Sequence, residues 1–348
     1  MVRTLYKIHK WTGLLAALPL CLILLTGAFS VFHDELDAYL TPGRTVQASP
    51  RTATLQEIST VLKSTFPNTQ LFGFVFPKSP TTAITVYLSK PSEVFIDPHT
   101  AAVSGTREGE SFSSFLRTLH VRLNIRQKWG RVVVGLFGLV LLISTVTGAI
   151  IYLPFMRGVF ALGLPFWKLR STGDPQLLWS DLHRFIGITS LLSNLIMSTT
   201  GFILGTQSLT PIRNPEPHPM KLQPLTKPGI GPDEALRIAM KTWPTAQPTS
   251  LLTPSKTSPR YTIYADFPGT FIRPAASFLV IHAGTGEILE QYDARTETPA
   301  IYAYNWIEPL HFGAYGGLLL KLIYFVSGLC AAALTITGPM VQILKRRA

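Results

Sequence analysis

The sequence predicts a membrane protein, mainly α, in which a bundle of four transmembrane helices carries two small α+β modules on one side of the membrane. Three observations predict this class. Four stretches are long, apolar and free of Asp, Glu, Lys and Arg. The short segments that flank them on one side are rich in Lys and Arg. The two long connections between spans each repeat a pattern of one helix followed by strands.

Each uncharged stretch is long enough to cross a bilayer, because about 20 apolar residues span the hydrocarbon core as a helix. The stretches are residues 11–32, 132–156, 185–212 (with an apolar centre that ends at Leu204) and 322–344. One buried helix of such length is possible in a soluble protein, but four are improbable. The first stretch exceeds a normal signal-peptide core and lacks an A-x-A site before His33, which favours an uncleaved anchor.

The composition narrows the class of protein further. Charged residues make up 14% of the 348 residues, against roughly 25% in a soluble globular chain. This low charge, together with a positive mean hydropathy of +0.28 and 11% aromatic residues, excludes a disordered chain. Two cysteines exclude a disulfide scaffold or a zinc ribbon. The net charge is 31 − 19 = +12, which alone is compatible with nucleic acid, anionic lipid or membrane topology.

The position of the basic residues decides among these three. Three short segments on one side of the spans, namely the N-terminal tip, the loop between spans two and three, and the tail, carry +3, +2 and +3. The excess of Lys and Arg marks the cytoplasmic side, so both termini are predicted to be cytoplasmic. The long connections, about 33–119 and 208–310, then lie outside, which in a bacterial cell is the periplasm. The prediction is a multi-pass membrane protein, with the lipid bilayer and no nucleic acid as its partner.

Each outer connection contains a compact α+β pattern. In the first, residues 54–66 have helical spacing, with Thr54 and Glu57 as a capping box. Strands are predicted at 71–76, 83–88 and 93–96, followed by a turn at 97–100 and one more short strand. The second repeats the pattern, with a helix from 231 to about 241, strands at 261–266 and 276–282, a turn at 283–286 and a strand at 287–291. The Pro-rich stretch before the second helix predicts a semi-rigid linker.

These elements divide the chain into eight segments. They are transmembrane helix one (1–34), the first outer module (35–110), an interfacial segment with helix two (111–157), the cytoplasmic loop (158–182), helix three (183–208), the linker (209–230), the second outer module (231–305), and helix four with the basic tail (306–348).

A fourfold pattern of histidine and glycine runs through the membrane part. Each span contains Thr-Gly near its end, at residues 26–27, 147–148, 200–201 and 337–338. A histidine precedes each pair, by 17, 27, 17 and 26 residues: His9, His120, His183 and His311. The alternating spacings indicate an internal repeat. We interpret the Thr-Gly pairs as helix contacts, in which the small residue lets the helices approach closely and the threonine can hydrogen-bond across the contact.

The topology sorts the histidines into an inner pair, His9 and His183, and an outer pair, His120 and His311. Neutral imidazole binds iron, copper and zinc, but zinc and copper sites usually need further ligands, and no Cys or carboxylate accompanies these histidines consistently. Haem needs only two axial ligands. Without a C-x-x-C-H motif, the pattern predicts two b-type haems, each held by two histidines.

The position of the outer pair leaves an alternative open. His120 lies 12 residues before Val132, and His311 lies 11 before Leu322, so a straight helix would carry each about 17 Å beyond its span. Either the spans extend through polar turns, or the outer haem lies at or above the membrane surface, where His33 is a rival ligand. The three remaining histidines are expected to be surface residues: His99, His218 and His282.

Basic residues near the histidines have two interpretations. Lys10, Arg122 and Arg184 are within two residues of a histidine, and could pair with haem propionates or simply lie at the membrane interface. A further basic group near the outer site, Arg122, Arg126, Lys128 and Arg131, could attract an acidic substrate or face lipid headgroups.

At these residues the chain resembles the PepSY-associated transmembrane family of bacterial inner-membrane proteins, over nearly its whole length. The resemblance rests on "LYKIHKWTGLLAALPLCLILLTGAFSVFHDELD", "LHVRL…WGRVVVGLFGLVLLISTVTGAIIYLP", "LHRFIGITSLLSNLIMSTTG" and "PLHFGAYGGLLLKLIYFVSGLCAAALTITG". It implies four helices, two haems and two periplasmic PepSY modules. Members include di-haem reductases that pass electrons from the cytoplasmic side to ferric siderophores. Many relatives carry Arg after helix one, where this chain has His33.

Three functions compete. The first is a haem-dependent ferric-siderophore reductase, an oxidoreductase that releases Fe(II) for uptake. Its donor is another molecule, a quinol or a reduced flavin, because the chain contains no G-x-G-x-x-G motif. The second is a non-enzymatic PepSY sensor or protease regulator that binds a partner at an edge strand. The third is a permease, which the span centres argue against, because they hold only Ser, Thr, Asn194 and Cys as polar residues.

Overall fold

The computed structural model describes residues 2–126, 128–161, 173–209, 215–225, 227, 229–313 and 315–345. The chain divides into two compact units. The helical unit comprises Met1–His33, Ser113–Arg213 and Ile307–Ala348, and the sheet unit comprises Asp34–Phe112 and Asn214–Trp306. Some of the residues used for the predictions lie outside the described part of the chain. They are part of the Pro-rich linker and four basic residues that were counted for the membrane orientation, Lys168, Arg170, Arg346 and Arg347.

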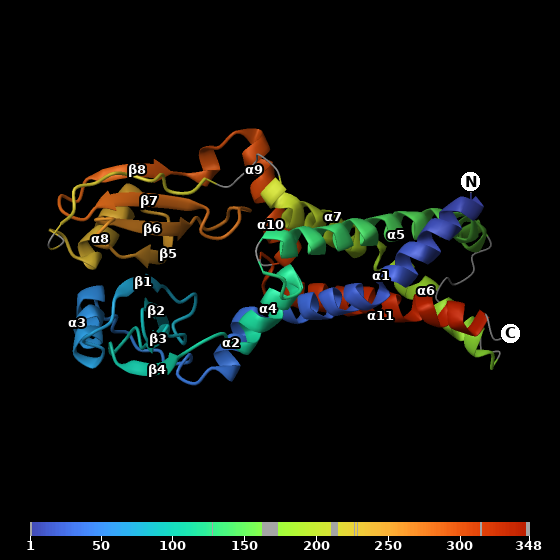
Figure 1. The fold of residues 1–348 in the computed structure, drawn as a ribbon, viewed down its shortest axis with the longest axis horizontal. Coiled ribbons are helices and arrows are strands. Elements are labelled where there is room, and N and C mark those ends of the chain that lie inside the picture. The colour runs from blue at the N-terminus through green and yellow to red at the C-terminus, as the bar shows by residue number, and fades with distance from the viewer. Residues whose placement is uncertain are drawn as a thin grey trace. The chain divides into compact units, whose positions relative to one another are not determined.

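The helical unit contains the apolar spans (Figure 1). Its helices are α1 (Val2–Ser30), α4 (Phe112–Arg122), α5 (Lys128–Ala161), α6 (Pro175–Thr189), α7 (Leu191–Thr206), η1 (Gln207–Leu209), α10 (Ile307–Phe312) and α11 (Gly317–Lys345). Among the described residues, α1, α5 and α11 are each long and apolar enough to cross a membrane, and α6 with α7 forms a further, bent candidate. These candidates indicate a membrane protein, and the described part of the chain holds three candidate spans, or four if the bent pair is one span.

The predicted third span is bent by 68° between α6 and α7, rather than being one straight helix. The bend lies at Ser190, whose backbone N–H and side-chain hydroxyl both donate to Ile186 O. The buried side chain of Asn194 donates to Ser190 Oγ at 3.0 Å. Ser and Asn side chains compete with the backbone for hydrogen bonds in this way, and because they supply partners at the break, it can lie within an apolar segment.

Glycines let the long helices approach closely. A Cβ placed on Gly205 of α7 would lie 2.4 Å from Gly135 Cα of α5, and one on Gly138 would lie 2.9 Å from Phe202 N. A Cβ on Gly328 of α11 would meet Ala28 of α1 at 2.8 Å. Small residues at such contacts are typical of membrane helix packing. Helix α1 packs against both α11 and α5, and α5 packs against α7.

The sheet unit is built on one eight-stranded antiparallel sheet (Figure 1). Its strands are β1 (Leu71–Val75), β2 (Ile84–Leu88), β3 (Glu93–Ile96), β4 (Val103–Arg107), β5 (Gln247–Leu252), β6 (Arg260–Asp266), β7 (Ser277–His282) and β8 (Ile288–Tyr292), in the order β4-β3-β2-β1-β5-β6-β7-β8. The two predicted modules are therefore joined edge to edge, because β1 pairs with β5 through Phe74 opposite Leu251. Strand β5 was not predicted, since its sequence QPTSLL is polar and contains Pro248.

One face of the sheet packs against two helices. Helices α3 (Leu55–Thr65) and α8 (Pro232–Thr242) share a single buried cluster with the strands. The predicted capping box of Thr54 and Glu57 begins α3. Asp233 of α8 also accepts from the N–H groups of Leu55 and Gln56, each at 2.8 Å, so the first turn of α8 caps α3. The remaining helices of the unit are α2 (His33–Leu40), η2 (Ala294–Thr296) and α9 (Pro299–Asn305).

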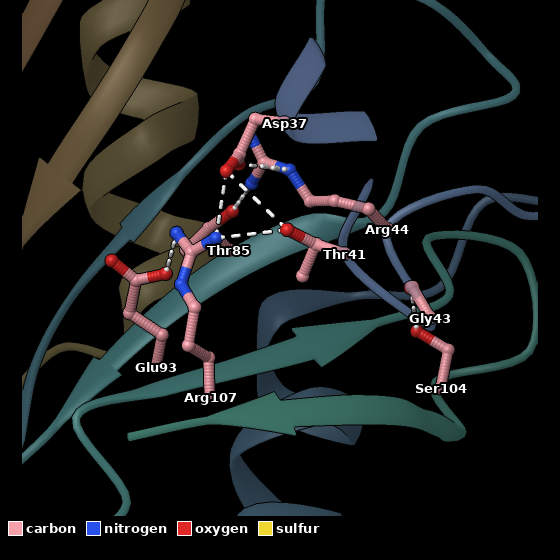
Figure 2. Close-up of polar contacts among 8 residues, drawn as sticks. All are labelled: Asp37, Thr41, Gly43, Arg44, Thr85, Glu93, Ser104 and Arg107. Carbon is pink, nitrogen blue, oxygen red and sulfur yellow. Dashed lines mark hydrogen bonds and ion pairs between the residues drawn. The ribbon is translucent and has the colours of Figure 1, made fainter. Parts of the chain in front are cut away.

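A buried ionic network fixes α2 to the opposite face of the sheet, and Figure 2 shows its side chains converging on Asp37. Asp37 is 3% exposed and pairs with Arg44 at 3.2 Å and with Arg107 at 2.7 Å. Arg107 also pairs with Glu93 of β3. Both guanidinium groups lie 5.4 Å from the ring centroid of Phe95. Because two arginines share the carboxylate, removing Asp37 would leave buried charge without a partner.

The prediction that the three remaining histidines lie at the surface is wrong for His99, which is only 7% exposed. Its ring nitrogens lie 2.7 Å from Arg51 O and 2.9 Å from Pro80 O. These carbonyl bonds, that to Pro80 first, raise the pKa of His99, because only the protonated ring donates to both. His218 is exposed, and His282 is partly exposed.

Candidate cofactor-binding site

The four histidines of the predicted pattern form two pairs of rings within the helical unit. The ring centroids of His9 and His183 lie 6.1 Å apart, with the ring planes at 67°. Those of His120 and His311 lie 6.2 Å apart, with the planes at 25°. These are the inner and outer pairs that the sequence pattern groups together, and their role as ligands stays a prediction. Because the rings of His120 and His311 neighbour each other, the geometry favours this outer pair over one that includes His33.

Each histidine ring rests on the glycine of one Thr-Gly pair. A Cβ on Gly27 would lie 2.6 Å from Cε1 of His120, and one on Gly148 would lie 2.9 Å from Cε1 of His9. The corresponding distances are 3.3 Å both for Gly201 with His311 and for Gly338 with His183. The sequence led us to expect that each glycine contacts another helix. This expectation was wrong about the partner, because each glycine instead makes room for an imidazole ring.

The hydrogen bonds of all four rings, in the part of the chain that the structure describes, are made through Nδ1. His9 Nδ1 lies 2.9 Å from Ser144 O, and His120 Nδ1 lies 2.8 Å from Ile23 O. A carbonyl oxygen only accepts, so both Nδ1 atoms carry the proton. The lone pair of each ring is then on Nε2, the nitrogen that remains available to a metal.

The other two rings bond to threonine hydroxyls. His311 Nδ1 lies 2.8 Å from Thr200 Oγ1, and His183 Nδ1 lies 2.8 Å from Thr337 Oγ1. Thr200 already donates its proton to Ile196 O at 2.6 Å, so it accepts from His311 and fixes the same tautomer. Sequence reasoning indicated that these threonines could hydrogen-bond across a helix contact, but it missed that their partners are the histidine rings.

The outer histidines reach their glycines because the chain turns sharply before spans α5 and α11. Leu123 and Asn124 have positive φ values of 49° and 57°, and they separate α4 from α5. Gly313 and Gly317, with φ values of 63° and 62°, separate α10 from α11. The spans therefore do not continue as straight helices to these histidines, which would have carried each about 17 Å beyond its span. His120 instead packs at the level of Gly27, within the first apolar span.

The contacts repeat between the two halves of the bundle. In the first half, His9 of α1 contacts Gly148 of α5, and His120, which precedes α5, contacts Gly27 of α1. In the second half, His183 of α6 contacts Gly338 of α11, and His311, which precedes α11, contacts Gly201 of α7. Each ring pair takes one histidine from each half. A cofactor at either pair would therefore be held between the halves.

The charged neighbours differ between the two pairs. Near the inner pair, Arg184 forms an ion pair with the buried Asp181, so its guanidinium already has a carboxylate partner. Near the outer pair, Arg117 and Arg122 lie on α4 together with His120, and Arg131 lies in the first turn of α5. Glu308 lies on α10 together with His311. The outer pair thus has a positively charged surrounding.

The inner end of the unit has an open cavity of about 630 Å³. It is lined by residues of α1 and one of α5: Val2, Arg3, Tyr6, Lys7, Lys10, Trp11 and Ile151. Lys10 and Trp11 directly follow His9, and Ile151 lies three residues beyond Gly148, on which that ring rests. Neither His9 nor His183 lines the cavity, which lies at the same end of α1 as His9.

The residues present fit a haem better than a bare metal ion. Imidazole nitrogens bind metals at about 2.0–2.1 Å, so two rings on opposite sides of one metal have centroids about 6 to 6.5 Å apart, as both pairs do. No group of three or more His, Cys, Asp or Glu side chains among the described residues is placed to hold a metal ion. A two-imidazole set without a third protein ligand suits a metal whose remaining positions are filled by a macrocycle.

The family model of the PepSY-associated TM region matches residues 6–346, almost the whole chain. No curated protein matched the sequence.

Proposed function

The chain belongs to the PepSY-associated transmembrane family, and from this premise we propose that it is a haem-dependent reductase that passes electrons from the cytoplasmic side of a bacterial inner membrane to a periplasmic ferric siderophore. The observation that carries the proposal is the pair of two-histidine sites, each with its Nε2 atoms available and its ring centroids near 6 Å apart. The family match supports a membrane protein, and the chemistry is inferred from the sites.

In this proposal His9 with His183, and His120 with His311, are the axial ligands of two b-type haems. Haem supplies one-electron redox chemistry when bound. The protein's residues orient the imidazoles: the carbonyls of Ser144 and Ile23 and the hydroxyls of the two threonines hold the Nδ1 protons. Holding that proton keeps Nε2 as the donor atom and raises its basicity.

The two sites belong at opposite faces of the membrane. Helix α1 carries a residue of each site, because His9 belongs to the inner pair and Gly27 contacts the ring of His120. These two residues are 18 positions apart, which corresponds to about 27 Å of helix rise. That length approaches the roughly 30 Å hydrocarbon core. We propose that α6 with α7 forms the third of four spans, so that both termini are cytoplasmic and the sheet unit, with its two PepSY modules, is periplasmic.

The proposed acceptor is the iron of a siderophore. One electron reduces Fe(III) to Fe(II), which binds hard oxygen donors less tightly and is released for uptake. Arg117, Arg122 and Arg131 near the outer pair would attract an anionic chelate. The cavity lined by Tyr6, Lys10 and Trp11, at the same end of α1 as His9, is where an electron donor, a quinol or a reduced flavin, could bind.

The proposal is tested with purified protein in sealed vesicles that enclose dithionite, with a ferric siderophore and a colorimetric Fe(II) chelator outside. We expect Fe(II) to form outside with the wild type and to fall at least tenfold in the His183→Ala and His120→Ala variants, since removing a ligand disables one site. The matched control is His218→Ala, whose ring is 80% exposed and outside both pairs.

Fe(II) formation that is equal in the His183→Ala and wild-type proteins would refute the proposal. A folded wild-type protein that contains no haem would also refute it. That result would favour the alternative, a non-enzymatic PepSY sensor or protease regulator that binds a partner at an edge strand of the sheet.

A further inference from the structure

The two halves of the bundle fix their histidines by different means. In the first half, His9 and His120 donate to backbone carbonyls. In the second half, His183 and His311 bond to threonine hydroxyls. Each ring pair therefore contains one histidine that is held by a backbone carbonyl and one that is held by a threonine hydroxyl. Of these two partners, only the hydroxyl can be removed by a substitution.

The threonines of the first half are present but are not needed for the same purpose. Thr26 and Thr147 donate to Ile23 O and Ser144 O, at 3.0 and 3.2 Å, which are the carbonyls that also accept from the rings. Thr147 Oγ1 itself lies 3.4 Å from His9 Nδ1, farther than the carbonyl. If the hydroxyl were lost, the carbonyl would still accept the proton of Nδ1.

In the second half the hydroxyl is the only partner shown for each ring nitrogen in the described part of the chain. Thr200 Oγ1 accepts from His311 while it donates to Ile196 O. Thr337 Oγ1 donates to Leu334 O at 3.4 Å, and so can accept from His183 Nδ1, which lies 2.8 Å away. Without the hydroxyl, a buried N–H would have no acceptor, which is costly in an apolar surrounding.

We propose that Thr200 and Thr337 are positioning residues, one for each haem, which fix the orientation and proton of His311 and His183, and that Thr26 and Thr147 are not. The inference rests on the proposed function, because it assigns these residues a role toward bound haem. It goes beyond the shared Thr-Gly pattern, in which all four threonines look equivalent.

The physical consequence follows from electron donation by the ligand. An imidazole that donates from Nδ1 pushes electron density to Nε2 and stabilises the ferric state. Losing the acceptor lets the ring rotate or shift its proton. The haem should then be held less tightly and have a higher reduction potential. The change should affect only the pair to which the threonine belongs.

The four threonines form a matched set for the test. Their exposed fractions are 5%, 6%, 5% and 4% for Thr26, Thr147, Thr200 and Thr337. Replacing Thr by Val removes the hydroxyl and keeps the shape. If the threonines only pack helices, the four Thr→Val variants should behave alike. If two of them position histidines, the variants should divide into two affected and two unaffected proteins.

The experiment measures haem per chain by absorbance and both midpoint potentials by optical redox titration. We expect Thr337→Val and Thr200→Val each to weaken retention of one haem about tenfold, or to raise its potential by up to 59 mV, equivalent to tenfold in a one-electron equilibrium. Thr147→Val and Thr26→Val should match the wild type. Thr337→Ser and Thr200→Ser, which restore the hydroxyl, should recover wild-type values.

Three results would overturn the inference while leaving the proposed function intact: equal effects in all four Val variants, wild-type behaviour of Thr337→Val and Thr200→Val, or no recovery with Ser. If Thr337→Val or Thr200→Val fails to fold, two other comparisons still decide between packing and positioning. They are the recovery of haem in the Thr→Ser variant and the behaviour of Thr147→Val or Thr26→Val. A wild-type protein without haem would overturn both the inference and the proposed function.

Discussion

At the residue scale, each site depends on three neighbours with separate physical roles. The imidazole supplies Nε2, an oxygen acceptor holds the proton on Nδ1, and a glycine leaves space for the ring edge. The inner and outer pairs differ in ring orientation, with planes at 67° and 25°. Since ligand orientation affects the electronic structure of haem iron, the two sites should give distinct low-spin EPR signals.

The space at the glycines can be tested directly. Gly27→Ala would place a Cβ 2.6 Å from the ring of His120, closer than a carbon contact allows, so we expect loss of the outer haem. Gly13→Ala on the same helix is the matched control, because nothing lies within 4 Å of its Cβ position. Haem absorbance per chain should fall by about half in the first variant and stay unchanged in the second. Retention of both haems in Gly27→Ala would contradict the packing described here.

At the element scale, the turns before α5 and α11 place the outer histidines. The residues at the first turn, Leu123 and Asn124, adopt positive φ without being glycine, so the sequence offers little signal of a reversal there. The strands with alternating apolar residues were predictable. Strand β5 was not, because its place comes from pairing with β1 and β6 rather than from its own pattern.

The joint between the two modules can be tested through Asp233. Its carboxylate accepts from two N–H groups at the start of α3, and loss of such a cap costs about 0.5–2 kcal/mol. We expect Asp233→Ala to speed amide hydrogen exchange in residues 55–58 by up to about tenfold, which equals 1.4 kcal/mol. Glu234→Ala is the control, since Glu234 forms an exposed ion pair with Arg237, and such pairs contribute little to stability. Equal exchange in both variants would show that Asp233 does not stabilise α3.

At the scale of the whole molecule, an internal repeat organises the helical unit. The spacing of histidine and Thr-Gly made the repeat and the pairing of histidines predictable from the sequence. Which glycine each histidine meets was not predictable, because that depends on how α1 packs with α5 and how α6 packs with α11. The continuity of the sheet through β1 and β5 was also hidden, since it joins segments far apart in the sequence.

The central claim is that the four histidines hold two haems, and the haem stoichiometry of the purified protein tests it most directly. We predict a Soret band, sharp b-type bands on reduction and about two haems per chain. Each of His9→Ala, His183→Ala, His120→Ala and His311→Ala should retain about one, while His33→Ala should retain two. A folded wild-type protein without haem, or His→Ala variants of the four that all keep two haems, would contradict the claim.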